Sequence, residues 1–138
     1  MILHAFTDGA SRGNPGESGI GFVVKGENGD VVFEGYGYIG VATNNIAEYS
    51  ALIVLLKRIK KVPRTKLIVH SDSELMVRQL NGKYKVKDEK IKGYYQKVQK
   101  LIAGNAHKFE LKHIPRSENS EADRLANKGI KSRKKIRI

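Results

Sequence analysis

The stretch that decides the fold is TDGASRGNPG, Thr7–Gly16, which joins an apolar segment to a glycine-rich one. Residues 2–7 are mainly apolar and predict a buried strand that carries Asp8 to its end. Three glycines, an asparagine and a proline follow within eight residues and predict a tight loop. Because that loop is not a helix, helix capping does not explain Asp8. The pattern instead indicates a functional site at this edge of a sheet.

The rest of the chain alternates between strand and helix patterns. A hairpin is expected at Asn28-Gly29, because Asn-Gly between apolar runs favours a tight turn. A meander of three strands followed by alternating helices and strands predicts an α/β fold. We expect a five-stranded mixed sheet, an antiparallel meander followed by parallel strands. The further predicted elements are strands at 20–24, 31–39, 66–70 and 107–114, and helices at 44–61, within 71–81, at 88–103 and at 119–128.

Composition limits the class of protein. The chain has 138 residues, no cysteine and no apolar run long enough to span a membrane, so we expect a cytoplasmic protein without disulfides. We expect one domain over residues 1–130 and a poorly ordered basic tail over 131–138. The net charge of +12 favours a polyanionic partner such as nucleic acid. The alternative is a lysine-rich surface that serves solubility or heat stability.

Four acids stand at the ends of predicted elements: Asp8, Glu48, Asp72 and Asp123. In a parallel α/β arrangement the ends of strands and the starts of the following helices share one rim of the sheet. Each acid near a helix start could instead cap free N–H groups. If the four converge, their mutual repulsion requires neutralisation, and a hard divalent cation such as Mg²⁺ provides it.

At these motifs the chain resembles the type 1 ribonuclease H family. The resemblance rests on TDGASRGNPG, TNNIAEYSAL, HSDSELMVRQL and HIPRSENSEADRLAN, which span nearly the whole chain in the family's order. It implies the ribonuclease H-like fold, a five-stranded mixed sheet with helices on both faces. It also implies hydrolysis of the RNA strand of RNA/DNA hybrids, leaving a 5′-phosphate and a 3′-hydroxyl. It also implies two Mg²⁺ or Mn²⁺ ions with substrate bound, held by the catalytic residues Asp8, Glu48, Asp72 and Asp123.

The resemblance further implies a set of nucleic-acid contacts. Thr43 matches a residue that binds a phosphate of the DNA strand, and the expected minor-groove contacts are Gly13, Asn14, Asn44, Asn45 and Glu74. The chain departs from the family at three points. Glu74 replaces an amide, Arg116 stands in a loop where many members carry a histidine, and only residues 81–90 occupy the place of a long basic protrusion. Arg116 is either a phosphate ligand or a solvated charge.

Three functions remain open at this point. The first is a metal-dependent endonuclease on RNA/DNA hybrids, acting as a monomer without a membrane partner. The second is a non-catalytic nucleic-acid-binding module on the same fold. The third is a related nuclease that acts mainly on another duplex, such as double-stranded RNA or a DNA recombination intermediate.

Overall fold

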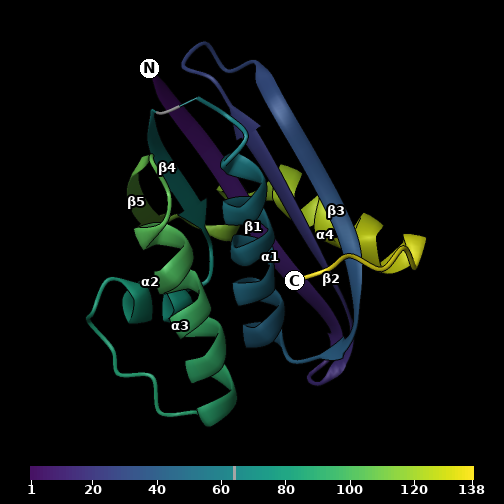
Figure 1. Cartoon of the computed structure of the whole chain (residues 1–138). Coiled ribbons are helices and arrows are strands. Elements are labelled where there is room, and N and C mark those ends of the chain that lie inside the picture. The colour runs from purple at the N-terminus through teal and green to yellow at the C-terminus, as the bar shows by residue number, and fades with distance from the viewer. Residues whose placement is uncertain (64) are drawn as a thin grey trace.

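The computed structural model describes residues 1–63 and 65–138 and folds them into one sheet flanked by helices (Figure 1). The strands are β1 (Ile2–Gly13), β2 (Gly16–Lys25), β3 (Val31–Ala42), β4 (Lys66–Ser71) and β5 (Lys108–His113). The helices are α1 (Asn44–Ile59), α2 (Glu74–Leu80), α3 (Glu89–Ala103) and α4 (Ser120–Ser132), with a short 3₁₀ turn at Arg116–Glu118.

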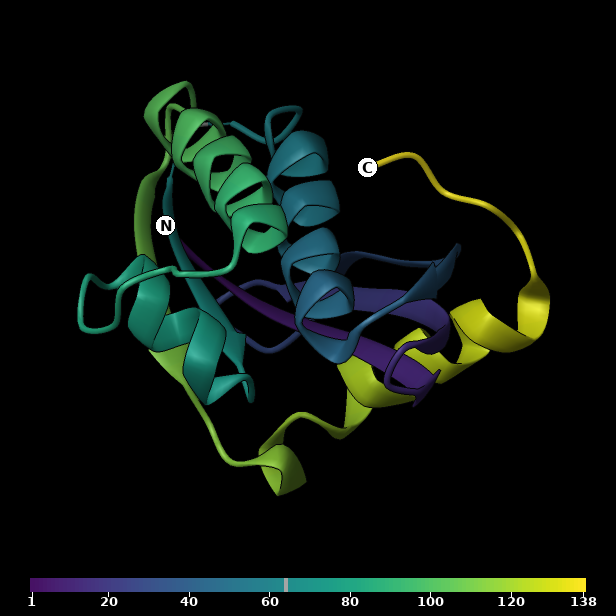
Figure 2. The ribbon, with the colours of Figure 1, turned by 90° about the horizontal axis from the view of Figure 1, so that it is seen from below.

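The sheet has the strand order β3-β2-β1-β4-β5. β1, β2 and β3 pair antiparallel, whereas β4 is parallel to β1 and β5 is parallel to β4. Helices α1 and α3 lie on one face and α4 lies on the other (Figure 2). This arrangement confirms the predicted five-stranded mixed α/β fold. Within the described residues, no helix is long and apolar enough to cross a membrane.

Helix α1 forms the centre of the core. Eleven of its sixteen residues are buried, including Tyr49 and the run from Ala51 to Leu56. An apolar surface around nearly the whole helix requires cover on all sides. The sheet covers one side and α3 packs on another. The helix that carries Glu48 is therefore held rigidly by its neighbours.

The glycine-rich stretch differs from the loop that the sequence suggests. β1 does not end at Asp8 but continues to Gly13, and the register pairs Asp8 with Gly21 and Gly13 with Gly16. The residues that read as a loop thus form the far half of a long hairpin. What ends at Thr7 is the parallel pairing of β1 with β4, whose last pair is Thr7 with Ser71.

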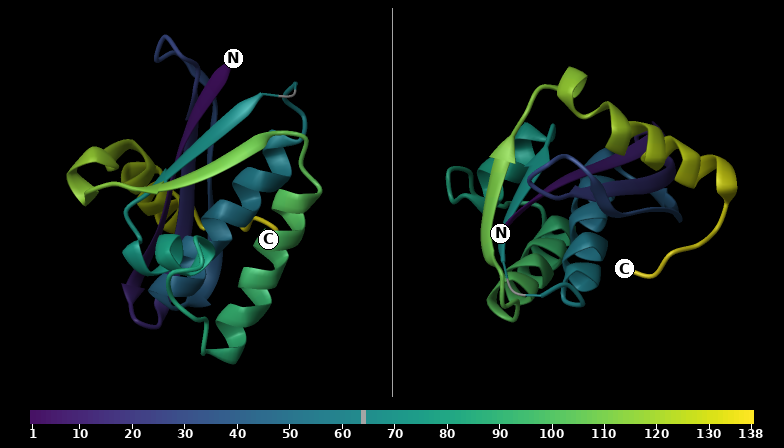
Figure 3. Two further views of the ribbon diagram at one scale, coloured as in Figure 1. Left: turned by 90° about the vertical axis from the view of Figure 1, so that its left-hand side faces the viewer. Right: turned by 90° about the horizontal axis from the view of Figure 1, so that it is seen from above.

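The C-terminal segment also differs from its prediction. α4 extends to Ser132 rather than ending near residue 128, and the residues beyond it are held against the sheet. The Tyr38 N–H donates to the Lys134 carbonyl (2.8 Å), and the Ile136 N–H donates back to the Tyr38 carbonyl (3.1 Å). From α4 the tail turns back past β3 toward the face of the sheet that carries α1 and α3 (Figure 3). The prediction of a poorly ordered tail is therefore wrong, because the tail serves as a short partner for β3.

Candidate active site

Three carboxylates converge at the end of the β1–β4 pairing. Side-chain oxygens of Asp8, Glu48 and Asp72 all lie within 4.8 Å of one another. Asp123 lines the same hollow, whose volume is about 470 Å³. The four acids come from β1, α1, the turn after β4 and α4, so only the folded chain brings them together.

The parallel register places Asp8 and Asp72 side by side. Thr7 and Ser71 are the last paired residues of β1 and β4, and Asp8 and Asp72 are the residues that follow them in the chain. Neighbouring parallel strands lie about 4.8 Å apart, so equivalent positions on them are adjacent. The structure thus places Asp8 and Asp72 together at one rim of the sheet, as predicted from the ends of the two strands.

Glu48 reaches the hollow because α1 lies unusually close to β1. A Cβ atom at Gly9 would stand 2.2 Å from the carbonyl carbon of Ala47, so only glycine fits there. The close approach lets the Gly9 N–H donate to Glu48 Oε1 at 2.6 Å. The glycine after Asp8 therefore sets the position of the acid on the neighbouring helix.

Asp123 is positioned by the docking of α4 on the opposite face. A Cβ atom at Gly21 would lie 2.4 Å from the Ala126 nitrogen, so β2 permits a close approach of the helix. At the start of α4, the buried Asn119 side chain donates from Nδ2 to the Thr7 carbonyl at 2.9 Å. The same β1 segment that carries Asp8 thus anchors the helix that carries Asp123.

Other residues occupy the N-cap positions of the helices that begin near Glu48, Asp72 and Asp123. Thr43 caps α1 by accepting from the Ile46 N–H (3.2 Å), and Ser73 caps α2 by accepting from the Met76 N–H (3.3 Å). Asn119 occupies the cap position of α4. The capping alternative for Glu48, Asp72 and Asp123 is therefore wrong.

The surroundings of the cluster raise the pKa of two of its acids, Asp8 and Glu48. Burial raises the pKa of Asp8 far above its ordinary value, and the charges of Glu48, Asp72 and Asp123 raise it further. Burial also raises the pKa of Glu48, although the Gly9 N–H acts in the opposite direction. Buried like charges favour the neutral form unless a counter-ion joins them. The hollow is therefore an electrostatically unfavourable place for carboxylates alone.

Three comparisons agree on the relatives of this chain. A family model described as reverse transcriptase-like matches residues 6–129. Ribonuclease H of Rhizobium meliloti is 34% identical, with 98% of this chain and 94% of that protein covered. LC11-RNase H1, solved in complex with an RNA/DNA hybrid, superposes with a TM-score of 0.90 at 40% identity, covering 94% of this chain and 97% of that chain. The chain belongs to the type 1 ribonuclease H family.

Some relatives of this chain are longer. The chain is 38% identical to Ribonuclease HI of Halobacterium salinarum and covers 64% of its length. It is 42% identical to a bifunctional protein of Mycobacterium tuberculosis and covers 33% of that protein. The family therefore includes proteins in which this domain is only part of the chain.

The nucleic-acid contacts that the family resemblance implies divide between two hollows. Asn44 and Arg116 line the acid hollow. Asn14, Thr43 and Asn45 line a second hollow of about 420 Å³, to which Lys85 and Lys87 contribute. The two hollows are linked at the hairpin tip, where the Asn44 N–H donates to Asn14 Oδ1 at 3.1 Å. A ligand that spans both hollows would contact the acids at one end and Lys85 and Lys87 at the other.

The other expected contacts lie at the margins. Gly13 stands at the hairpin tip with φ = 101°, a conformation that favours glycine. Glu74 is exposed, and its carboxylate lies 3.7 Å from Arg78 Nε in the next turn of α2. Arg116 is 83% exposed, and its guanidinium lies 4.0 Å from Asp123 Oδ1. Arg116 therefore faces the acids while remaining accessible to a ligand.

Sequence reasoning missed two polar residues at the acid hollow. Asn127, one helical turn after Asp123, donates from Nδ2 to the Asp123 carbonyl at 2.9 Å and lines the hollow. Ser11 lines it from the hairpin. The spacing of four residues between Asp123 and Asn127 was the available signal, because such residues share one face of a helix.

Proposed function

We propose that this ribonuclease H hydrolyses the RNA strand of RNA/DNA hybrids in a reaction that depends on divalent metal ions. The observation that carries the proposal is the convergence of Asp8, Glu48 and Asp72 within 4.8 Å, with Asp123 on the same hollow. The family supports it, since several relatives carry the name ribonuclease H and LC11-RNase H1 was solved with an RNA/DNA hybrid.

The residues present fit a hard divalent cation. Carboxylate oxygens are the ligands that Mg²⁺ and Mn²⁺ prefer, and the cluster offers them at close range. The raised pKa values of Asp8 and Glu48 show the same need for positive charge. We infer that Asp8, Glu48, Asp72 and Asp123 hold two ions when substrate is bound. Such ions supply activation of the attacking water and stabilisation of the leaving 3′ oxygen.

The chain's own residues orient the site. The Gly9 N–H fixes one oxygen of Glu48 and leaves the other free to bind. Asn127 steadies the turn that carries Asp123. Arg116, exposed at the mouth of the hollow, is suited to bind a phosphate beside the scissile one. No side chain in this set is an activated nucleophile, so direct attack by water is the mechanism that we propose.

We assign recognition of the hybrid to the surface that runs from Asn44 to the second hollow, which Lys85 and Lys87 line. Asn14, Asn44 and Asn45 offer hydrogen-bonding side chains at the hairpin tip and the start of α1. Amide side chains can distinguish RNA from DNA by bonding to 2′-hydroxyl groups across the wide minor groove. Lys85 and Lys87 are exposed and add positive charge for the phosphate backbone. The protein should therefore cut hybrid and leave duplex DNA intact.

A substrate panel tests the proposal. End-labelled hybrid, double-stranded RNA and duplex DNA are incubated with Mg²⁺, with Mn²⁺ or with EDTA, and the products are sized and their ends identified. We expect metal-dependent cutting of the RNA strand of the hybrid, with 5′-phosphate and 3′-hydroxyl ends, and loss of cutting in Asp8→Asn. Hybrid binding without product in either metal would instead identify a binding module. Comparable cutting of double-stranded RNA would identify a broader nuclease.

A further inference from the structure

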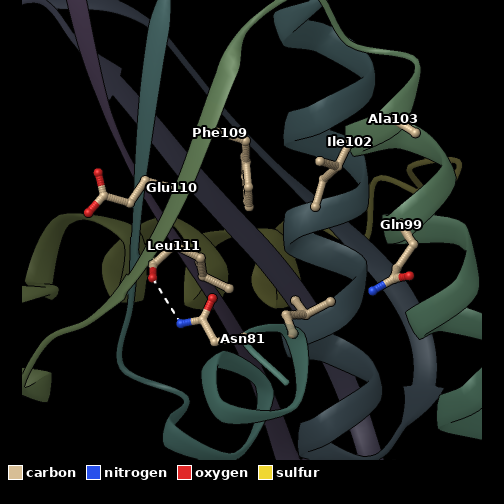
Figure 4. A pocket seen from close by; sticks show the side chains of 8 residues that line it. Asn81, Gln99, Ile102, Ala103, Phe109, Glu110 and Leu111 are labelled. Atoms are coloured by element: carbon tan, nitrogen blue, oxygen red, sulfur yellow. Dashed lines mark hydrogen bonds between the residues drawn. The ribbon is translucent and has the colours of Figure 1, made fainter. Parts of the chain in front are cut away.

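An apolar hollow that the proposed function does not use lies beside β5 (Figure 4). It has a volume of about 600 Å³ and is bounded by β5, the end of α2 and the last turns of α3. The side chains of Phe109 and Leu111 extend from β5 toward Ile102 of α3, and Gln99 lies beside Ile102 on the same helix. Phe109, Ile102 and Leu80 are only partly buried. These side chains form an apolar surface that is open to a ligand.

The main chain of β5 is also open along this side. β5 is the last strand of the sheet, and its even-numbered positions bond to β4: the Lys108 N–H donates to the Thr65 carbonyl and the Ile114 N–H to the Ser71 carbonyl. In a parallel ladder the positions between them face the other way. Phe109 and Leu111 therefore direct their main-chain groups to the free edge.

One side chain already occupies part of that edge. Asn81 Nδ2 donates to the Leu111 carbonyl at 3.2 Å (Figure 4), in the place that the N–H of an added strand would take. By the same alternation, the N–H groups of Phe109 and Leu111 point to the free edge. An unpaired edge of this kind can pair with a further strand.

The outer face of β5 gives the edge a charge preference. Lys108, Glu110 and Lys112 alternate with the apolar residues that face the hollow. The Glu110 carboxylate forms ion pairs with Lys66 (3.5 Å) and Lys112 (3.6 Å). Lys108 forms no ion pair with any residue that the structure describes. Side chains directly opposite on neighbouring strands interact, so acidic residues on an added strand would lie beside these lysines.

We propose that the β5 edge binds an extended segment of a partner protein in which apolar and acidic residues alternate. The apolar side chains enter the hollow between Phe109 and Ile102, and the acidic ones lie on the outer face beside Lys108 and Lys112. Main-chain bonds to Phe109 and Leu111 extend the sheet by one strand, and the Asn81 amide is displaced from the Leu111 carbonyl. Affinity comes from the main chain and the hollow, and specificity comes from the alternation.

Labelled synthetic peptides test the alternation. The probe is a fluorescein-labelled octapeptide in which valine and aspartate alternate, and binding is followed by fluorescence anisotropy. A peptide of the same composition with its valines grouped together should bind about tenfold more weakly or worse. Two peptides that are N-methylated on alternate amides separate the edges of the strand. One should lose binding and the other should keep it, since only one edge faces β5.

Protein variants locate the site. Ile102→Ala should weaken the alternating peptide about tenfold, while Val41→Ala, which removes an exposed apolar side chain elsewhere, should not. Lys108→Glu should weaken the aspartate peptide and improve binding of a valine–lysine peptide. Lys83→Glu, the matched charge reversal outside the hollow, should change neither. Circular dichroism confirms that each variant is folded.

Several results would overturn the proposal. These are equal binding of the alternating and grouped peptides, equal effects of both methylation patterns, or indifference to Ile102→Ala and Lys108→Glu. Self-association in sedimentation that Ile102→Ala abolishes would assign the edge to a second copy of the chain. Displacement of the peptide by single-stranded DNA would assign it to nucleic acid. Cleavage of hybrid should be unchanged in both variants, so this proposal and the proposed nuclease activity succeed or fail separately.

Discussion

Replacing Asp8 by asparagine should stabilise the metal-free protein while removing its response to metal. Asp8 is 5% exposed and shares a 4.8 Å cluster with two other carboxylates. At this separation two charges repel by about 3 kcal/mol at an effective dielectric constant near 20. The protein can relieve that repulsion by protonating one acid. At pH 7 this costs at most about 4 kcal/mol, since the ordinary aspartate pKa is about 3.9 and each pH unit is worth about 1.4 kcal/mol.

The expected gain for Asp8→Asn in EDTA at pH 7 is therefore about 1–3 kcal/mol in the free energy of unfolding. The pH dependence follows from the direction of the pKa shift. The pKa of Asp8 is raised in the folded state, so the folded chain holds its proton more tightly than the unfolded chain. That contribution is complete below about pH 4 and is lost as the pH rises. The advantage of Asp8→Asn should thus be small at pH 4 and grow toward pH 8.

Urea denaturation in EDTA at several pH values measures this difference, and Glu34→Gln, an exposed acid on β3, is the control. Added Mn²⁺ should then stabilise the wild type more than Asp8→Asn, because a ligand stabilises the state that binds it. If Asp8→Asn is less stable than the wild type in EDTA at pH 7, or if the difference does not vary with pH, the electrostatic account of the hollow is wrong.

Three further predictions concern the parts that hold the site. Gly9→Ala should cost about 3 kcal/mol or more and disturb Glu48, whereas Gly93→Ala in open space on α3 should be neutral or stabilising; urea unfolding compares the two. Ile136→Ala should cost about 1–2 kcal/mol by removing the side chain that packs on Gly37, and Arg137→Ala should not; thermal unfolding measures both. Arg116→Ala should raise the KM for hybrid and reduce the salt dependence of that KM, and Arg116→Lys should have an intermediate KM. Steady-state cleavage at several salt concentrations measures both quantities. Equal KM values for the wild type and both variants would show that Arg116 is only a solvated charge.

The positions of Asp8 and Asp72 could be predicted because they follow from topology. A buried strand that leads into an acid appears twice in the sequence, and parallel pairing of the two strands places the acids together. The position of Glu48 could not be predicted in the same way, because the approach of α1 to β1 depends on the absence of a side chain at Gly9. The sequence shows the glycine but not which helix will lie against it. The four acids were therefore visible as candidates, whereas their contacts were not.

The hairpin and the tail could not be predicted for a common reason. Residues 9–13 have low strand propensity and read as a loop, but pairing with β2 provides the bonds that propensity does not. The tail is rich in lysine and arginine and reads as disordered, but Ile136 fits against Gly37 on a strand distant in sequence. In both cases a long-range partner overrides the local pattern. The bond from the Asn119 side chain to the Thr7 carbonyl was unpredictable for the same reason, because it joins residues near the two ends of the chain.

The charge of the whole protein and the charge of its site oppose each other. A net charge of +12 disfavours the approach of a divalent cation, whereas the carboxylates of the acid hollow attract one. A bound nucleic acid reverses this balance, because its phosphates offset the positive field and add oxygen ligands beside the carboxylates. Binding of metal and binding of hybrid should therefore strengthen each other, and by linkage the coupling must be the same in both directions. On this account the free protein holds metal weakly, and the acids reach their full affinity only when a hybrid lies across the hollow.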